Sequence, residues 1–88
     1  MIEKIKKLQG ICNSDFDDII LGYIESCKID LKSIGVSLKK INSSDNLIET
    51  AILTYVLSFL DINNAEMYAN SYSLQKDMLR HLTEYKEA

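Results

Sequence analysis

The chain has 88 residues, of which 47% are hydrophobic and 26% are charged, and its net charge is −3. This length accommodates one domain, expected over residues 1–88, and the composition is that of a globular protein. The acidic balance excludes a general attraction to nucleic acid. The lack of proline and the presence of only three glycines favour helices with few breaks.

Two helices are expected in the first part of the chain. Residues 2–9 place an apolar side chain at every third position and predict a short amphipathic helix that Gly10 ends. Ser14 is a suitable N-cap for a second helix over about 15–34, and aspartates in its first turn suit the positive end of a helix. The apolar stripe of this second helix comprises Phe16, Ile20, Tyr23, Ile24, Cys27, Leu31 and Ile34.

The stretch NLIETAILTYVLSFLD, residues 46–61, is apolar on almost every side. It follows an expected loop over 36–43 and predicts a third helix over about 45–61, with Ser44 as N-cap and Asp45 in the first turn. One face is expected in the core: Ile48, Ile52, Tyr55, Val56 and Phe59. The remaining apolar surface exceeds what a lone small bundle shelters, so sister subunits are expected to cover it.

The last helix is expected over about 65–85, with Asn63 or Asn64 as its cap. Its buried stripe is expected to comprise Met67, Leu74, Met78, Leu82 and Tyr85, widened by Tyr68, Tyr72 and Leu79. The predicted fold class is therefore all-α. It is a small helical bundle of three longer helices plus the short N-terminal helix, with the third helix in the middle.

Five apolar residues are candidate contacts with another subunit or partner. Two of them, Leu21 and Ile29, share the back face of the second helix and point away from its stripe. The other three, Leu53, Leu57 and Leu60, lie on a second face of the third helix and are candidates for either core or interface. If Leu57 is in the core, Leu57→Asp should abolish folding; if it is at an interface, only assembly should suffer.

The sequence contains no arrangement of side chains that is typical of catalysis. Cys12 and Cys27 lack the spacing of metal ligands and predict reduced thiols, as expected of a cytosolic protein. The single histidine, His81, is expected in a surface ion pair with Asp77 or Glu84. We therefore expect no enzyme activity, no catalytic or metal-binding residues and no cofactor.

Neither a membrane nor a specific DNA site is favoured as a partner. A membrane span needs about 20 consecutive apolar residues, whereas residues 46–61 are shorter and interrupted by polar side chains. Between Ile41 and Gln75 there is no Lys or Arg, so a recognition helix is not expected there. There are two small basic clusters, Lys4-Lys6-Lys7 and Lys39-Lys40. Their side chains are either solvated or in contact with an acidic surface or nearby nucleic acid, and the sequence leaves both roles open.

Three segments resemble the phage head–tail connector (adaptor) family. SDFDDIILGYIESCKIDLKSIG resembles its acidic entry into a long helix that ends in glycine, and DNLIETAILTYVLSFL is similar to its apolar helix. AEMYANSYSLQKDMLRHLTEY resembles its tail, with Ala65, Glu66, Tyr68, Ser71, Tyr72, Leu74 and Tyr85 in place. The resemblance covers about residues 14–85, although the turn DINNAE lacks the proline or extra glycine common in the family.

The resemblance implies a structural protein without catalysis. Copies would form a homo-oligomeric ring below the portal protein and join the head to the tail, as a platform for the next head-completion or tail protein. DNA would pass through the ring without specific binding. The protein would be assembled in the bacterial cytoplasm and reside in the virion at the head–tail junction. The alternative is a small helical DNA-packaging accessory or a nucleic-acid-binding regulatory domain, which requires a salt-dependent affinity for DNA.

Overall fold

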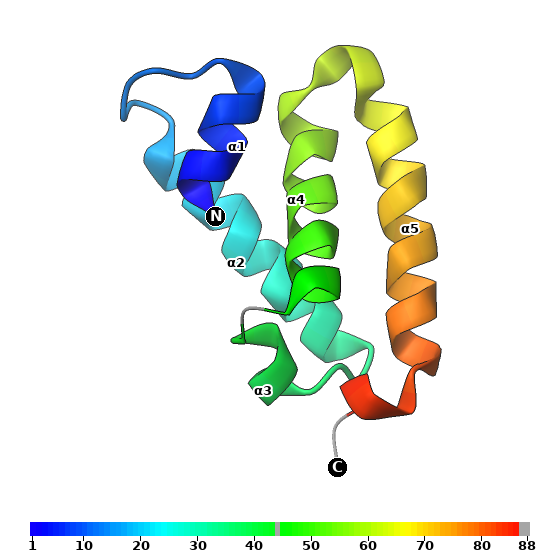
Figure 1. Cartoon of the computed structure of the whole chain (residues 1–88). Coiled ribbons are helices and arrows are strands. Elements are labelled where there is room, and N and C mark those ends of the chain that lie inside the picture. The colour runs from blue at the N-terminus through cyan, green and yellow to red at the C-terminus, as the bar shows by residue number, and fades with distance from the viewer. Residues whose placement is uncertain (44, 87–88) are drawn as a thin grey trace.

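The computed structural model describes residues 1–43 and 45–86, and it is built from helices (Figure 1). In chain order these are α1 (Ile2–Gln9), α2 (Asp17–Ser33), α3 (Leu38–Ile41), α4 (Asn46–Leu60), the 3-10 turn η1 (Ile62–Asn64), α5 (Ala65–His81) and the 3-10 turn η2 (Thr83–Tyr85). Within these ranges the one β-type pairing is an isolated bridge between Val36 and Lys86. The predicted all-α bundle is confirmed.

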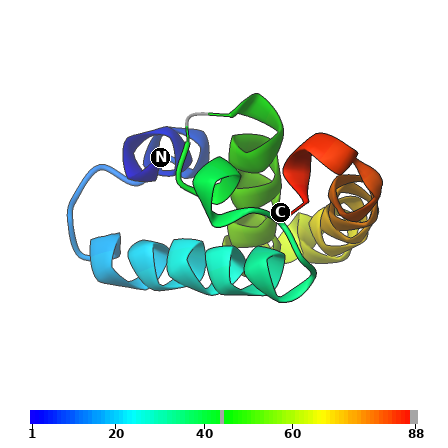
Figure 2. The ribbon, with the colours of Figure 1, turned by 90° about the horizontal axis from the view of Figure 1, so that it is seen from below.

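The apolar helix α4 lies at the centre of the bundle. Both views place it between α1 on one side and α5 on the other, with α2 passing along a third side (Figures 1 and 2). Its buried residues therefore occupy most of its circumference: Ile48, Ala51, Ile52, Thr54, Val56 and Leu57. The chain's own helices therefore cover most of α4, although Leu47 remains exposed, and cover by sister subunits stays a prediction. Phe59, expected in the core, is 50% exposed and stacks on Tyr23 of α2 at 4.7 Å between ring centroids.

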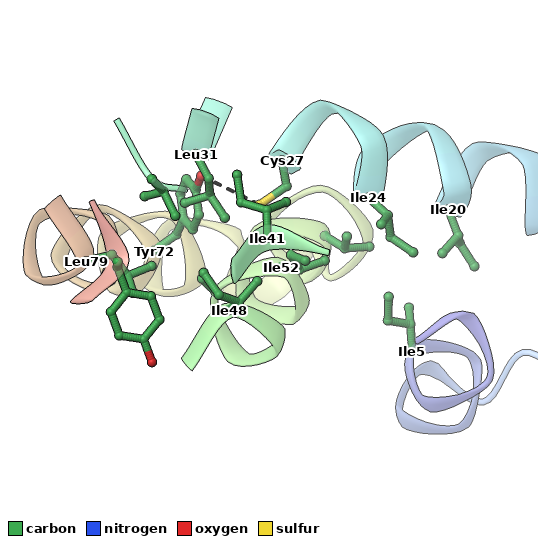
Figure 3. Close-up of a cluster of buried hydrophobic side chains, with 14 residues drawn as sticks. Ile5, Ile20, Ile24, Cys27, Leu31, Ile41, Ile48, Ile52, Tyr72 and Leu79 are labelled. Carbon is green, nitrogen blue, oxygen red and sulfur yellow. Dashed lines mark hydrogen bonds between the residues drawn. The ribbon is translucent and has the colours of Figure 1, made fainter. Parts of the chain in front are cut away.

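The core is one cluster to which every α-helix contributes. Figure 3 shows Ile5 of α1 pointing toward Ile20 and Ile24 of α2, while side chains of α2, α4 and α5 meet farther along. Its buried members are Ile5, Ile20, Ile24, Cys27, Leu31, Val36, Ile41, Ile48, Ala51, Ile52, Val56, Tyr72, Leu79 and Tyr85. The short helices are therefore part of the core: α1 adds Ile5 and α3 adds Ile41.

The start of α2 differs from the prediction. Gly10 ends α1 in the left-handed conformation, φ +69°, as expected. Ser14 does not cap α2, because the Asn13 side chain accepts the Asp15 amide and the chain makes a separate turn before the helix begins at Asp17. Phe16 consequently stands at the N-cap position, half-exposed instead of buried.

Asp45 caps α4. Its side chain accepts hydrogen bonds from the backbone amides of Leu47 at 3.0 Å and Ile48 at 3.3 Å, which satisfies two of the amides that a helix N-terminus leaves without a partner. Ser44, the predicted cap, lies outside the described residues. The loop expected over 36–43 contains the single-turn helix α3.

The buried face of α5 is not the predicted stripe. Met67, Leu74 and Met78 are exposed, whereas Tyr72 and Leu79, expected only on the flank of the stripe, are buried. The face on α4 and α2 carries polar tips that find partners: the Tyr72 hydroxyl donates to Asp30 at 2.7 Å, and Gln75 donates to Thr54 at 3.2 Å. Large side chains whose polar donors are satisfied bury well, so this face displaces the more apolar one, although the Gln75 Oε1 atom is buried without a hydrogen-bond partner among the described residues.

Helix α5 ends at His81 and not at Tyr85. Leu82 adopts an extended conformation, and η2 then turns Tyr85 back into the core against α3 and the start of α4. The Tyr85 hydroxyl lies 2.8 Å from both carboxylate oxygens of Asp45, and its backbone carbonyl accepts the Ser37 amide at 2.7 Å. These bonds fasten the C-terminal segment to the middle of the chain.

Candidate functional site

Exposed apolar side chains gather on the outer face of α5. Met67, Leu74 and Met78 recur at helical spacing, opposite the face that holds Tyr72 and Leu79. Leu74 is 74% exposed. Two carboxylates, Glu66 and Asp77, lie along one flank of this row. We name these five residues the α5 edge: Glu66, Met67, Leu74, Asp77 and Met78.

Three further exposed apolar side chains lie on α1 and at the start of α2. Leu8 of α1, Phe16 and Ile19 are all exposed, and the exposed lysines Lys4 and Lys7 share the flank of Leu8 on α1. We name these five residues the α1 edge: Lys4, Lys7, Leu8, Phe16 and Ile19. Beside it an open hollow of about 260 Å³ is lined by Gln9, Ile11, Phe16 and Leu60.

A polar cluster fixes the rotation of α5 and so keeps its apolar row outward. Asp30 of α2 accepts the Tyr72 hydroxyl and lies 3.2 Å from the Lys76 ammonium. Burial, followed by the hydrogen bond to Asp30, raises the pKa of Tyr72, so the hydroxyl remains a donor. The Cys27 thiol donates to the Tyr72 oxygen at 3.6 Å. Breaking this cluster would leave partly buried polar groups without partners, which resists rotation of the helix.

The basic clusters are partly used inside the molecule. Lys6 is buried and pairs with Asp17 across α1 and α2, with 2.9 Å between the ammonium and a carboxylate oxygen. The hydrogen bond to Asp17 is the main reason that the pKa of Lys6 is raised. Lys40 lies over the ring of Tyr85, 5.1 Å from its centroid. Lys6 is therefore a structural residue, whereas Lys4, Lys7 and Lys39 are exposed.

The family of the chain follows from its whole length. A family model described as phage connector protein matches residues 1–87. The chain belongs to the phage connector family. No curated protein and no solved structure matches it. The resemblance to head–tail connectors is thus confirmed, and it extends over α1 as well as the segments that carried it.

The predicted contact residues of this connector fall into two groups. Leu21 and Ile29 are exposed on α2, and Ile29 is 71% exposed. Leu53 and Leu60 are half-buried against the core, and Leu57 is only 5% exposed. Of the two roles open for Leu57, its burial favours the core. The role of the other four in contacts stays a prediction.

Sequence reasoning missed both edges. Met67, Leu74 and Met78 were assigned to the core because they form an apolar stripe, although the tyrosines on the other face of α5 offered a larger area to bury. Ile19 could have been found by counting, because it does not share the spacing of Ile20, Ile24, Cys27 and Leu31.

Phage connector proteins are structural and generally non-enzymatic, and they associate with other head and tail proteins. Within residues 1–43 and 45–86, no group of three His, Cys, Asp or Glu side chains could hold a metal ion. His81 lies on the surface of α5, with its Nδ1 atom 3.8 Å from a carboxylate oxygen of Asp77. None of the described helices combines the length and the apolar character that crossing a membrane requires.

Proposed function

We propose that this connector assembles as a ring below the portal and joins the phage head to the tail. The observation that carries the proposal is the match of the connector family over residues 1–87. A ring subunit needs two different contact surfaces, one for each neighbour. The chain exposes two separate apolar edges, the α1 edge and the α5 edge, and this supports the proposed ring.

The partners in this proposal are further copies of the chain, the portal protein on one side and the next head-completion or tail protein on the other. Exposed apolar patches are typical of surfaces that another protein covers. The proposed location is the head–tail junction of the virion.

DNA passes through the proposed ring without specific binding. The net charge of −3 repels a passing duplex, and two of the five lysines of the basic clusters are engaged within the chain, Lys6 with Asp17 and Lys40 with Tyr85. Both observations support the connector over a nucleic-acid-binding accessory.

The direct test is to produce phage particles without this chain and examine them by electron microscopy. We expect filled heads that lack tails, and restoration of tailed particles when the purified chain is added back. Tailed, infectious particles formed at a normal yield without the chain would contradict the proposal. For the alternative function, duplex DNA is titrated at low and moderate salt; tight binding that weakens with salt would favour it.

A further inference from the structure

Resting on the proposed ring, we infer that the α5 edge of one copy docks on the α1 edge of a second copy of this chain. Both edges expose several apolar side chains. Such patches on a small protein mark surfaces that bind another molecule.

The two edges lie on opposite sides of the molecule. In both views α4 stands between α1 and α5 (Figures 1 and 2). A contact between unlike surfaces on opposite sides leaves one surface free on each end of a pair, so copies can add repeatedly until the ring closes. A contact between two like surfaces would stop at a dimer.

The charged side chains beside Leu8 and beside Met67 are opposite in sign, whereas the start of α2 around Phe16 and Ile19 carries the exposed Asp15 and Asp18. On the α1 edge, Lys4 and Lys7 form no ion pair with any described residue. On the α5 edge, Glu66 likewise has no such partner, while Asp77 is paired with Arg80. The chain carries no Lys or Arg between Ile41 and Gln75, so nothing basic in that stretch offsets Glu66. A lysine beside Leu8 that pairs with Glu66 of the next copy would help to select the partner and its orientation.

A hollow beside Phe16 could receive an apolar side chain of the α5 edge. The α1 edge borders the apolar hollow of about 260 Å³ at Ile11, Phe16 and Leu60. The α5 edge presents Leu74, an aliphatic side chain with most of its surface in solvent. An apolar cavity of about 150 Å³ holds a benzene molecule, so the hollow has room for one such side chain. An aliphatic side chain anchored in an apolar pocket is one way to build the buried centre of an interface.

The test blocks one edge at a time. In Leu8→Asp the α1 edge is blocked, and in Leu74→Asp the α5 edge is blocked; both side chains are exposed, so circular dichroism should show an unchanged fold. We expect the unaltered chain to associate as its concentration rises to millimolar in sedimentation velocity, and each variant to remain monomeric. A mixture of the two variants should form one-to-one pairs and nothing larger, because each retains one working edge.

Leu38→Asp is the matched control, since Leu38 of α3 is an exposed apolar residue that is not among the candidate contacts and lies on neither edge. It should associate as the unaltered chain does. Exchanging the charges gives a second test. Lys7→Glu and Glu66→Lys should each weaken association by about tenfold at low salt. A chain that carries both changes should associate as strongly as the unaltered chain.

Three results would overturn the inference: an unaltered chain that stays monomeric throughout, edge variants that associate normally, or a mixture that forms no pairs. Loss of association in Leu38→Asp alone would also overturn it and would place the contact on α3. The particle experiment above is independent of these results. Rings that form despite both edge variants would refute this pair of surfaces and leave the connector function standing.

Discussion

At the scale of single residues, Asp45 holds together parts of the chain that are far apart in sequence. It caps α4 through the Leu47 and Ile48 amides and accepts the hydroxyl of Tyr85, forty residues away. Burial, followed by the bond to Asp45, raises the pKa of Tyr85 to about 12, so the hydroxyl remains a donor at neutral pH. One carboxylate therefore stabilises both a helix start and the C-terminal closure.

Asp45→Ala should lower the free energy of unfolding by about 2 kcal/mol, because it removes a helix cap and a charge-assisted hydrogen bond. Chemical denaturation measures the change. Tyr85→Phe is the matched variant: it removes only the hydroxyl and should lower the same free energy by about 1 kcal/mol. Equal losses in the two variants would mean that the cap contributes nothing.

Stability should also fall in acid through Asp45. Partial burial opposes its ionisation, but hydrogen bonds from Tyr85, Ile48 and Leu47 outweigh this and lower its pKa below the usual value. Because the folded-state pKa is the lower one, the contribution is complete above the unfolded pKa of about 3.9 and is lost as the pH falls through the folded value. Asp45→Asn keeps a capping side chain and should show a shallower loss of stability below about pH 4. If the stability of Asp45→Asn fell below about pH 4 as steeply as that of the unaltered chain, this role of Asp45 would be contradicted.

The two cysteines should differ in reactivity. Cys12 is exposed and Cys27 is buried, and burial raises the pKa of the Cys27 thiol to about 11. Since the thiolate is the reactive form, a thiol reagent at neutral pH should label Cys12 quickly and Cys27 only after denaturant is added. Mass spectrometry of the peptides distinguishes them. Rapid labelling of Cys27 in the folded chain would show that α2 and α5 separate readily.

At the scale of elements, α2 and α4 were predictable and α5 was not. Periodicity located the buried residues of α2 because Ile20, Ile24, Cys27 and Leu31 recur at helical spacing on one face. Helix α5 has two competing faces, and the choice between them depends on Asp30 and Thr54, which belong to other helices. Partners so distant in sequence are invisible to a count of apolar spacing. Apolar spacing could not predict the exposure of Phe59 either, because that exposure depends on how α2, which carries Tyr23, packs against α4.

The rotation of α5 can be tested by paired truncations. Leu79 is 1% exposed and lies in the core, so Leu79→Ala should lower the free energy of unfolding by about 3 kcal/mol. Leu74→Ala on the outer face should change it by less than about 0.5 kcal/mol. Denaturant titration of both variants gives the comparison. The reverse order would mean that the stripe of Met67, Leu74 and Met78 faces the core after all.

At the scale of the whole molecule, the apolar excess noticed in the sequence is real but lies mostly outside α4. The chain buries most of α4 and leaves apolar side chains exposed on α1, α2, α3, α5 and the turn η1, and at Leu47 and Phe59 of α4. Composition revealed the excess, because 47% of an 88-residue chain is hydrophobic. Its position required the packing of all helices together, so the contact surfaces could not be read from the sequence. The family resemblance did not depend on this packing and was correct.

The most direct measurement of the central claim, that another molecule covers the α5 edge in the virion, uses its two methionines. Met67 and Met78 are exposed in the free chain, and oxidation to the sulfoxide depends on access. Intact particles and chain released from the same particles are treated with peroxide and compared by mass spectrometry. The account predicts that both methionines oxidise much more slowly in particles. Equal rates in the two samples would contradict it.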